Sequence, residues 1–259
     1  MDDRFLLVSA PFMPHPDSWS KWPGSIALLN GLRARLPVDI FPWPTRRGAD
    51  GPKGGGSVTG ALFEAIKPHH HVIDMGGGAG LAILMVAKNL PQPPRSVTLA
   101  GFFPTPATAR AMGKNALADS MDALFGVVAS GPSTALIQLQ AEGASEDFIQ
   151  TARRQIEREL DRGHLQAYMS RARTTDFSRE RFDMSFPVLY LRMLSFPGAD
   201  SEEADEIFKQ LVPKAEIDSL EKWGSQLQLE DGGSELAGKV AGFVERVIAA
   251  RGTRATVGG

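Results

Sequence analysis

The 259-residue sequence contains no cysteine, which excludes disulfide bonds, thiolate nucleophiles and cysteine-ligated metal sites. It has no dense basic cluster, and its formal charge of -2 at pH 7 argues against a nucleic-acid partner. No apolar run approaches the roughly 18–20 residues that span a membrane, and the N-terminus has no secretory signal. We therefore expect a soluble, cytoplasmic protein with neither a nucleic-acid partner nor a membrane span.

Short apolar strands alternate with helical segments in the first hundred residues. The predicted strands cover residues 5–8, 38–41, 71–73 and 96–99, and the helices between them cover 25–36, 58–67 and 81–90. This alternation is typical of a parallel sheet with helices on both faces. Because 42% of the residues are apolar, the chain has enough material for a large core.

The alternation stops between residues 104 and 184. Only helical patterns appear there, at 107–125, 133–141 and 146–171. Strands then return at 186–191 and 215–220, with helices at 202–211 and 234–250. The sequence thus predicts a doubly wound, mostly parallel α/β sheet with a helical cap insertion, in which 1–104 and 185–259 form the core and 105–184 the cap.

The segment 71–80 runs from a strand through Asp74-Met75 and a glycine-rich turn into a helix. Its residues 74–77 resemble the Ser-Met-Gly-Gly nucleophile elbow of the α/β-hydrolase fold, with aspartate in place of serine. Trp19 resembles the tryptophan after that family's oxyanion loop, and 224–230 resembles its Gly-His-x-x-x-x-Glu segment. The order of these segments resembles the α/β-hydrolase fold over nearly the whole chain. An aspartate at the elbow is similar to that of haloalkane dehalogenases and epoxide hydrolases.

The departures from this resemblance concern the catalytic groups. Ser225 stands where the family has its histidine, and residues 192–197 contain no carboxylate. The oxyanion loop contains Pro11, which has no N–H to donate, so the remaining donor would be the N–H of Met75. Without a base to activate water, an ester formed on Asp74 would be long-lived. The resemblance implies the scaffold, whereas the residues argue against ordinary hydrolysis.

The same glycine turn also resembles motif I of S-adenosylmethionine-dependent methyltransferases, Asp-x-Gly-x-Gly-x-Gly. The predicted strand 96–99 is not followed by the acid that would hold the ribose of that cofactor, and the helical insertion replaces the expected strands. We therefore rank the hydrolase-like fold first and expect no cofactor.

Two residues are candidates for catalysis. Asp74 is expected at the carboxyl ends of the strands, where ligands bind in such sheets, and would act as an acid or base. Alternatively, it only holds the backbone of the glycine turn. Tyr168 lies in the predicted cap, where epoxide hydrolases carry a tyrosine that activates the epoxide oxygen. It is therefore a candidate proton donor, with packing as the alternative.

Apolar side chains near the same edge are candidates for substrate binding: Phe12, Trp19, Trp43, Met75 and Phe102. The same residues are equally consistent with core packing. The three histidines 69–71 are consecutive in a strand, so their side chains cannot easily converge, and we expect no metal site.

We therefore expect a non-hydrolytic enzyme of cyclase, lyase or isomerase type that binds a largely apolar small molecule between core and cap, with Asp74 as acid or base. The alternatives are a catalytically silent binding protein on the same scaffold, a hydrolase with Asp74 as nucleophile, and a methyltransferase. The sequence leaves the oligomeric state open.

Overall fold

The computed structural model describes residues 2–9, 22–41, 43, 58–75, 79–130, 136, 146–159, 161–193, 202–221 and 230–257. Within these residues, six parallel strands form one sheet in the order β2-β1-β3-β4-β5-β6, which confirms the predicted fold class. The strands are β1 (Arg4–Val8), β2 (Val38–Ile40), β3 (His70–Asp74), β4 (Ser96–Ala100), β5 (Val188–Met193) and β6 (Glu216–Leu220).

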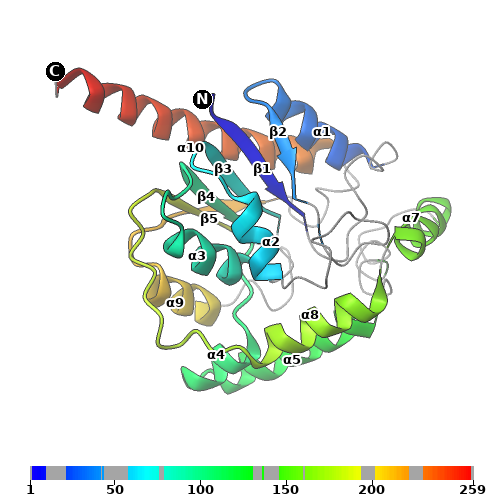
Figure 1. Cartoon of the computed structure of the whole chain (residues 1–259). Helices are drawn as coiled ribbons and strands as arrows, with labels where there is room; N and C mark the ends of the chain where they lie inside the picture. Colours follow the sequence, from blue (N-terminus) through cyan, green and yellow to red (C-terminus); the bar gives the residue numbers. More distant parts are fainter. Residues whose placement is uncertain are drawn as a thin grey trace.

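Helices cover both faces of the sheet (Figure 1). On one face lie α1 (Pro23–Arg33) and α10 (Glu230–Val257), and on the other α2 (Val58–Ala65), α3 (Gly80–Asn89) and α9 (Glu202–Leu211). Alternate residues of β1 enter the two cores, Phe5 and Leu7 on the α1 side and Leu6 and Val8 on the other. Because helices cover both faces, the central strands β3 and β4 are buried along their whole length rather than at alternate positions.

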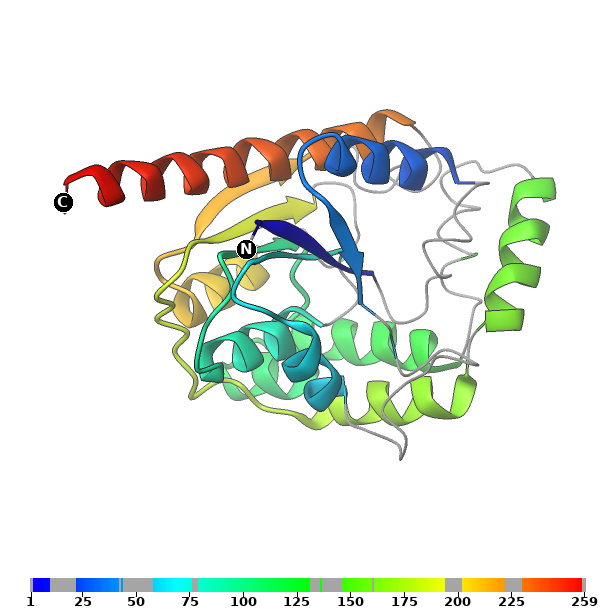
Figure 2. The same ribbon diagram turned by 45° about the horizontal axis from the view of Figure 1, so that its top comes forward.

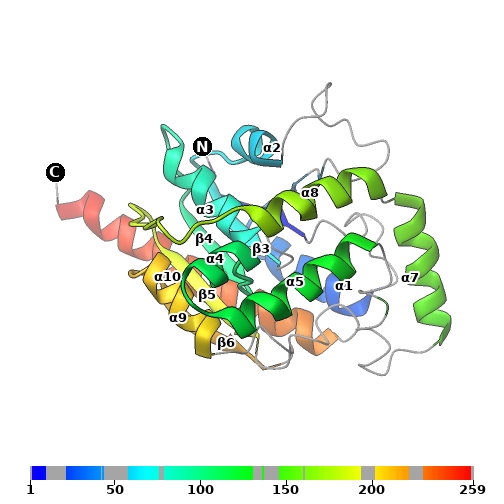
Figure 3. The same ribbon diagram turned by 90° about the horizontal axis from the view of Figure 1, so that it is seen from below.

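The insertion between β4 and β5 contains α4 (Pro106–Ala111), α5 (Asn115–Ser130), α7 (Glu146–Glu159) and α8 (Arg162–Thr174). In Figure 3, α5 and α8 run side by side and α7 lies at their end. The single helices predicted over 107–125 and 146–171 are wrong. Gly113 has a φ of 77° and ends the first, whereas Asp161 begins α8 by accepting a hydrogen bond from the His164 N–H. Apart from Leu136, the predicted helix 133–141 lies outside the described residues.

The two ends of the insertion are tied together by buried threonines. The Thr105 hydroxyl donates to the Thr175 carbonyl at 2.6 Å, and the Thr108 hydroxyl accepts from the Phe177 N–H at 2.9 Å. The insertion also shares its hydrophobic core with one face of the sheet, since Leu165 belongs to the same cluster as the strand residues. The chain therefore enters and leaves the insertion at one place.

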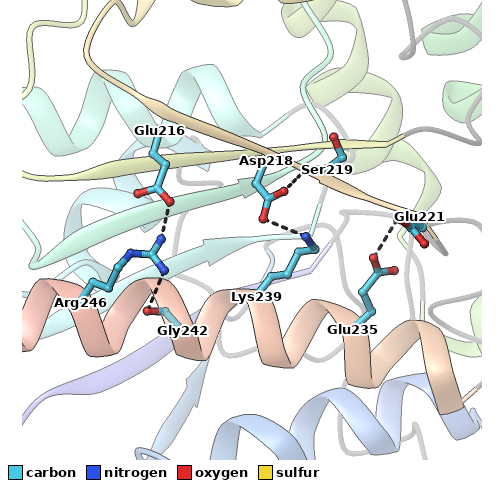
Figure 4. Close-up of polar contacts among 8 residues, drawn as sticks. All are labelled: Glu216, Asp218, Ser219, Glu221, Glu235, Lys239, Gly242 and Arg246. Atoms are coloured by element: carbon cyan, nitrogen blue, oxygen red, sulfur yellow. Dashed lines mark hydrogen bonds and ion pairs between the residues drawn. The ribbon is translucent and has the colours of Figure 1, made fainter.

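The long helix α10 extends well past the predicted end at residue 250, and its C-terminal end projects beyond the sheet (Figure 2). Beside it, the edge strand β6 alternates exposed acidic residues with partly buried ones. Asp218 pairs with Lys239 of α10 at 2.8 Å, and Glu216 pairs with Arg246 (Figure 4). None of the described helices is long and apolar enough to cross a membrane.

Candidate active site

Asp74 is the last residue of β3 and is paired in register with Val8 of β1 and Leu99 of β4. From β1 the chain crosses to β2 on one side and then to β3 on the other, so the strand order reverses between β1 and β3. In doubly wound sheets, ligands bind at the carboxyl ends of the strands at such a reversal. The structure therefore places the Asp74 carboxylate where this architecture forms binding sites.

The Asp74 side chain is 1% exposed and faces the start of α3. A Cβ atom at Gly80, the first residue of α3, would lie 3.3 Å from Asp74 Oδ2 and 3.5 Å from the Leu99 side chain. The helix has no side-chain cap of its own, because its N-cap residue is Ala79. A carboxylate at the positive end of a helix is electrostatically favoured. The glycine at position 80 thus makes room for the carboxylate against the helix.

The geometry at Asp74 differs from that of a nucleophile elbow. An elbow holds its nucleophile on a sharp, strained turn, whereas Asp74 is a regular strand residue. None of the described non-glycine residues has a positive φ. The Met75 N–H donates to the Val8 carbonyl at 2.9 Å, so the oxyanion donor implied by the resemblance is already engaged. The residues that follow, Gly76–Gly78, lie outside the described residues and carry no side chain that can react.

Tyr168, on α8 of the insertion, is brought close enough to Asp74 for the two to interact electrostatically. Its side chain is 7% exposed, and burial raises the pKa of its phenol. The negative charge of Asp74 raises this pKa further. The phenol is therefore protonated at neutral pH, so it can donate a hydrogen bond but cannot serve as a base.

Trp43, which follows β2, is fully buried and links this region to the insertion. Its indole N–H donates to the Ser9 carbonyl at 2.5 Å. Its ring packs edge-on against Phe41, with centroids 5.1 Å apart, and against Tyr168, with centroids 5.5 Å apart. Of the residues that we predicted for the site, the structure thus brings Asp74, Tyr168 and Trp43 together.

The other predicted binding residues lie elsewhere or are not described. Phe102 is buried in a separate aromatic group with Tyr190 and Phe208, with centroids 6.1 and 5.0 Å away. The buried side chain of Met75 joins the hydrophobic cluster on the α1 and α10 face, whereas Asp74 points to the opposite face. Phe12 and Trp19 lie outside the described residues, as do Pro11 and Ser225.

A Ser-His-Asp arrangement that the sequence did not indicate occurs near the amino ends of β3 and β4. The Ser96 hydroxyl lies 2.8 Å from Nδ1 of His71, and Nε2 of His71 lies 3.9 Å from Asp3. Ser96 is fully buried, and burial, aided by the charges of Arg251 and Arg95, lowers the pKa of His71 to about 4. A general base works best when its pKa is near the operating pH. We conclude that this group is structural.

The neighbouring histidines also have structural contacts. His70 accepts a hydrogen bond from the Lys67 N–H at its Nδ1 atom and lies 3.3 Å from Asp39 through Nε2. Asp39 in turn forms two hydrogen bonds with Arg4, at 2.8 and 2.9 Å. Within the described part of the chain, no three acidic or histidine side chains form a group that would hold a metal ion.

No family profile matches the chain, and no curated protein matches it in sequence. Many solved structures match it in shape. A bromoperoxidase from Bacillus anthracis superposes with a TM-score of 0.63 and 14% identity, covering 96% of this chain and 91% of that one. A haloalkane dehalogenase variant from Bradyrhizobium elkanii has a TM-score of 0.58 and 14% identity, covering 98% and 92%.

An esterase from Exiguobacterium antarcticum has a TM-score of 0.62 and 13% identity and covers 95% of this chain and 93% of its own. At these identities the likeness establishes the fold alone, since one fold hosts many functions. The protein has the α/β-hydrolase fold, in agreement with the strand order and the all-parallel pairing. This outcome supports ranking the hydrolase-like fold above a methyltransferase fold.

Proposed function

We propose that the protein is a small-molecule enzyme of the α/β-hydrolase fold that catalyses a non-hydrolytic reaction, an isomerisation, cyclisation or elimination. The observation that supports this most directly is the burial of two ionisable side chains, Asp74 from the sheet and Tyr168 from the insertion, within electrostatic reach of each other. Pairs of titratable groups in apolar surroundings at a strand-order reversal are typical of active sites.

In the proposed mechanism, the Asp74 carboxylate removes a proton from a carbon or hydroxyl group of the substrate. The protonated phenol of Tyr168 donates a hydrogen bond to the oxygen on which negative charge develops. The carboxylic acid of Asp74 then returns the proton to another substrate atom or to a leaving group. No water is consumed in these steps. The hydrogen bond from the phenol to the substrate oxygen is stronger in surroundings of low dielectric constant than in water.

The neighbours of the two groups support the proposal of a largely apolar substrate with one oxygen function. Val8 and Leu99 flank Asp74 in the sheet, and Trp43 packs against Tyr168. Two polar groups among apolar side chains orient a ligand, while the apolar surface supplies most of the affinity.

Three features support a non-hydrolytic reaction over hydrolysis through an ester on Asp74. Asp74 lies within a regular strand, and the Met75 N–H is engaged with Val8. Ser225 stands in the sequence where the water-activating histidine of the resembling enzymes would be. A covalent ester therefore has neither the expected geometry nor the expected base.

The experiment is to incubate the purified protein with a defined mixture of small apolar carbonyl and hydroxyl compounds in water enriched in heavy oxygen, followed by mass spectrometry. We expect a product of unchanged mass, or one that has lost a neutral fragment, with no label beyond the carbonyl exchange that occurs without the protein. Asp74→Asn should lower its rate at least about 100-fold, because general acid–base catalysis contributes that much. Asp119→Asn, which replaces an exposed carboxylate, is the matched control. Products that gain one labelled water would contradict the proposal.

A catalytically silent binding protein is the second candidate. This candidate is favoured by the position of the Asp74 carboxylate against Gly80, because that position gives the carboxylate a structural role at the start of α3. For this candidate, Asp74→Asn should lower the thermal midpoint by several degrees, and no compound of the mixture should be converted. Compounds that raise the thermal midpoint without being converted would identify its ligand class.

A further inference from the structure

We infer that Trp43 is a positioning residue, which docks Tyr168 and with it the insertion against the carboxyl edge of the sheet beside Asp74. This inference deepens the proposed function and rests on it for its catalytic meaning. Trp43 would set where the phenol lies relative to the carboxylate.

The first observation is that Trp43 is fixed to the core. Its indole N–H donates to the backbone carbonyl of Ser9, the residue that follows β1. Both residues are buried, so this bond is shielded from competing water. A buried donor that loses its acceptor pays the desolvation cost in full. The indole ring therefore has one favoured orientation relative to the end of β1.

The second observation is that the oriented ring contacts both the core and the insertion. Phe41 meets it at an interplanar angle of 83°, and Tyr168 meets it at 68°. Edge-to-face pairs of this kind prefer a particular geometry and contribute more than their buried area alone. The contact with Tyr168 joins residues that are far apart in the chain, so it holds α8 to the sheet.

The third observation is that the three residues concerned lie at the carboxyl ends of three neighbouring strands, β2, β1 and β3. Trp43 follows β2, Ser9 follows β1, and Asp74 ends β3. One hydrogen bond and one ring contact thus connect the end of β1 to the phenol. Loss of Trp43 is expected to let Tyr168 move away from Asp74, while the hydrogen bonds of the sheet stay intact.

The sequence allows a direct test, because it contains only two tyrosines and no cysteine. Tetranitromethane, which nitrates accessible tyrosines, would report on Tyr168 in the insertion and on Tyr190 in the centre of the sheet. Both are buried, at 7% and 0% exposed. Peptide mass spectrometry gives the ratio of nitration at Tyr168 to that at Tyr190. A general loss of stability raises both rates together, whereas a loss of positioning raises the ratio.

We expect Trp43→Phe, which keeps a ring but lacks the N–H, to raise this ratio about fivefold, the effect of one ordinary hydrogen bond on a local opening equilibrium. Trp43→Ala should raise it at least about tenfold. Phe208→Ala is the reciprocal control, because Phe208 packs against Tyr190 with centroids 4.4 Å apart. This variant should lower the ratio by exposing Tyr190.

An unchanged ratio in Trp43→Phe and in a folded Trp43→Ala would overturn the inference. If Trp43→Ala does not fold, the Phe variant alone decides it. The readout needs no turnover, so it is independent of the proposed reaction. A raised ratio together with full activity of Asp74→Asn would leave Trp43 as the docking residue and reject the role of Asp74. An unchanged ratio with an inactive Asp74→Asn would reject Trp43 as the docking residue and support the role of Asp74.

Discussion

The protonation state of Tyr168 decides what chemistry the phenol can do. Burial and the charge of Asp74 both raise its pKa above the ordinary value near 10. The group is therefore a hydrogen-bond donor over the whole physiological range. In the proposed mechanism this distinguishes it from Asp74, because a carboxylate has no proton to donate until it has taken one from the substrate.

The first prediction is that Tyr168→Phe lowers kcat about 100-fold, the usual cost of losing one donor to a developing negative charge. The wild-type rate should not fall through phenol ionisation up to about pH 10, because the donor form persists below a raised pKa. Initial rates measured across pH on the converted compound would check both statements. An alkaline limb near pH 8–9 that disappears in Tyr168→Phe would refute the assignment.

The position of Asp74 at the carboxyl edge was predictable from the sequence, because a short apolar run followed by a glycine-rich turn indicates the end of a strand. The regular strand geometry of Asp74 was not predictable, because the sequence does not show at which residue the strand ends and the turn begins. The hydrogen bond between Trp43 and Ser9 had no signal in the sequence. It joins residues 34 positions apart whose proximity depends on the strand order.

At the scale of elements, the crossing of α1 and α10 depends on small residues. A Cβ atom at Gly31 of α1 would lie 2.6 Å from Ala237 Cβ, and one at Gly233 of α10 would collide with the Gly24 carbonyl. These distances are far below ordinary contact, so a side chain at either position requires the helices to separate. Each glycine therefore allows α1 and α10 to pack closely against each other where they cover one face of the sheet.

The second prediction is that Gly31→Ala and Gly233→Ala each lower the free energy of unfolding by about 1–3 kcal/mol, the usual range for overpacking. Gly238→Ala is the matched control on the same helix, because its Cβ would meet nothing within 4 Å. It should stabilise by about 0.5–1 kcal/mol through helix propensity. Chemical denaturation of the three variants provides the comparison. Equal effects at positions 233 and 238 would contradict the packing argument.

The third prediction concerns the ion pairs between β6 and α10 (Figure 4). Asp218 and Lys239 are half and nearly one third exposed, so solvent and salt screen their attraction. A double-mutant cycle with Asp218→Asn and Lys239→Gln should give a coupling of about 0.5 kcal/mol that disappears in 1 M salt. A larger coupling that resists salt would indicate a desolvated pair.

Element types were predictable because the strands are short apolar runs and the helices repeat apolar residues every three or four positions, yet helix boundaries in the insertion were not. Apolar spacing continues across Gly113 and across Asp161, so the pattern alone predicts continuous helices. The structure breaks them where Gly113 adopts a positive φ and where Asp161 caps a new helix. Both are single-residue effects that compete with periodicity.

At the scale of the whole molecule, the buried group around His71 links stability to pH. The pKa of His71 is lowered from 6.5 to about 4, first by burial. The unfolded chain therefore binds a proton that the folded chain rejects. This contribution to stability is fully present above pH 6.5 and is lost as the pH falls from 6.5 to about 4.

The fourth prediction is that the free energy of unfolding falls by about 1 kcal/mol per pH unit between pH 6 and 4.5 on account of this one group. His71→Gln should remove that part of the slope. His164→Gln, which changes a histidine whose side chain is 58% exposed, is the control for replacing a histidine as such. Denaturant titrations at several pH values would measure it. Identical slopes in wild type and His71→Gln would refute the assignment.

The tie between Thr105 and Thr175 has a mechanical consequence. Because this tie draws the two ends of the insertion together, it is the pivot for small rotations of α8, whose buried Leu165 packs in the core shared with the sheet. Tyr168 lies seven residues before Thr175, about 10 Å along α8. The ring contact between Tyr168 and Trp43 therefore acts at the end of a lever. At that distance, a rotation of a few degrees about the threonines displaces the phenol by only a fraction of an ångström.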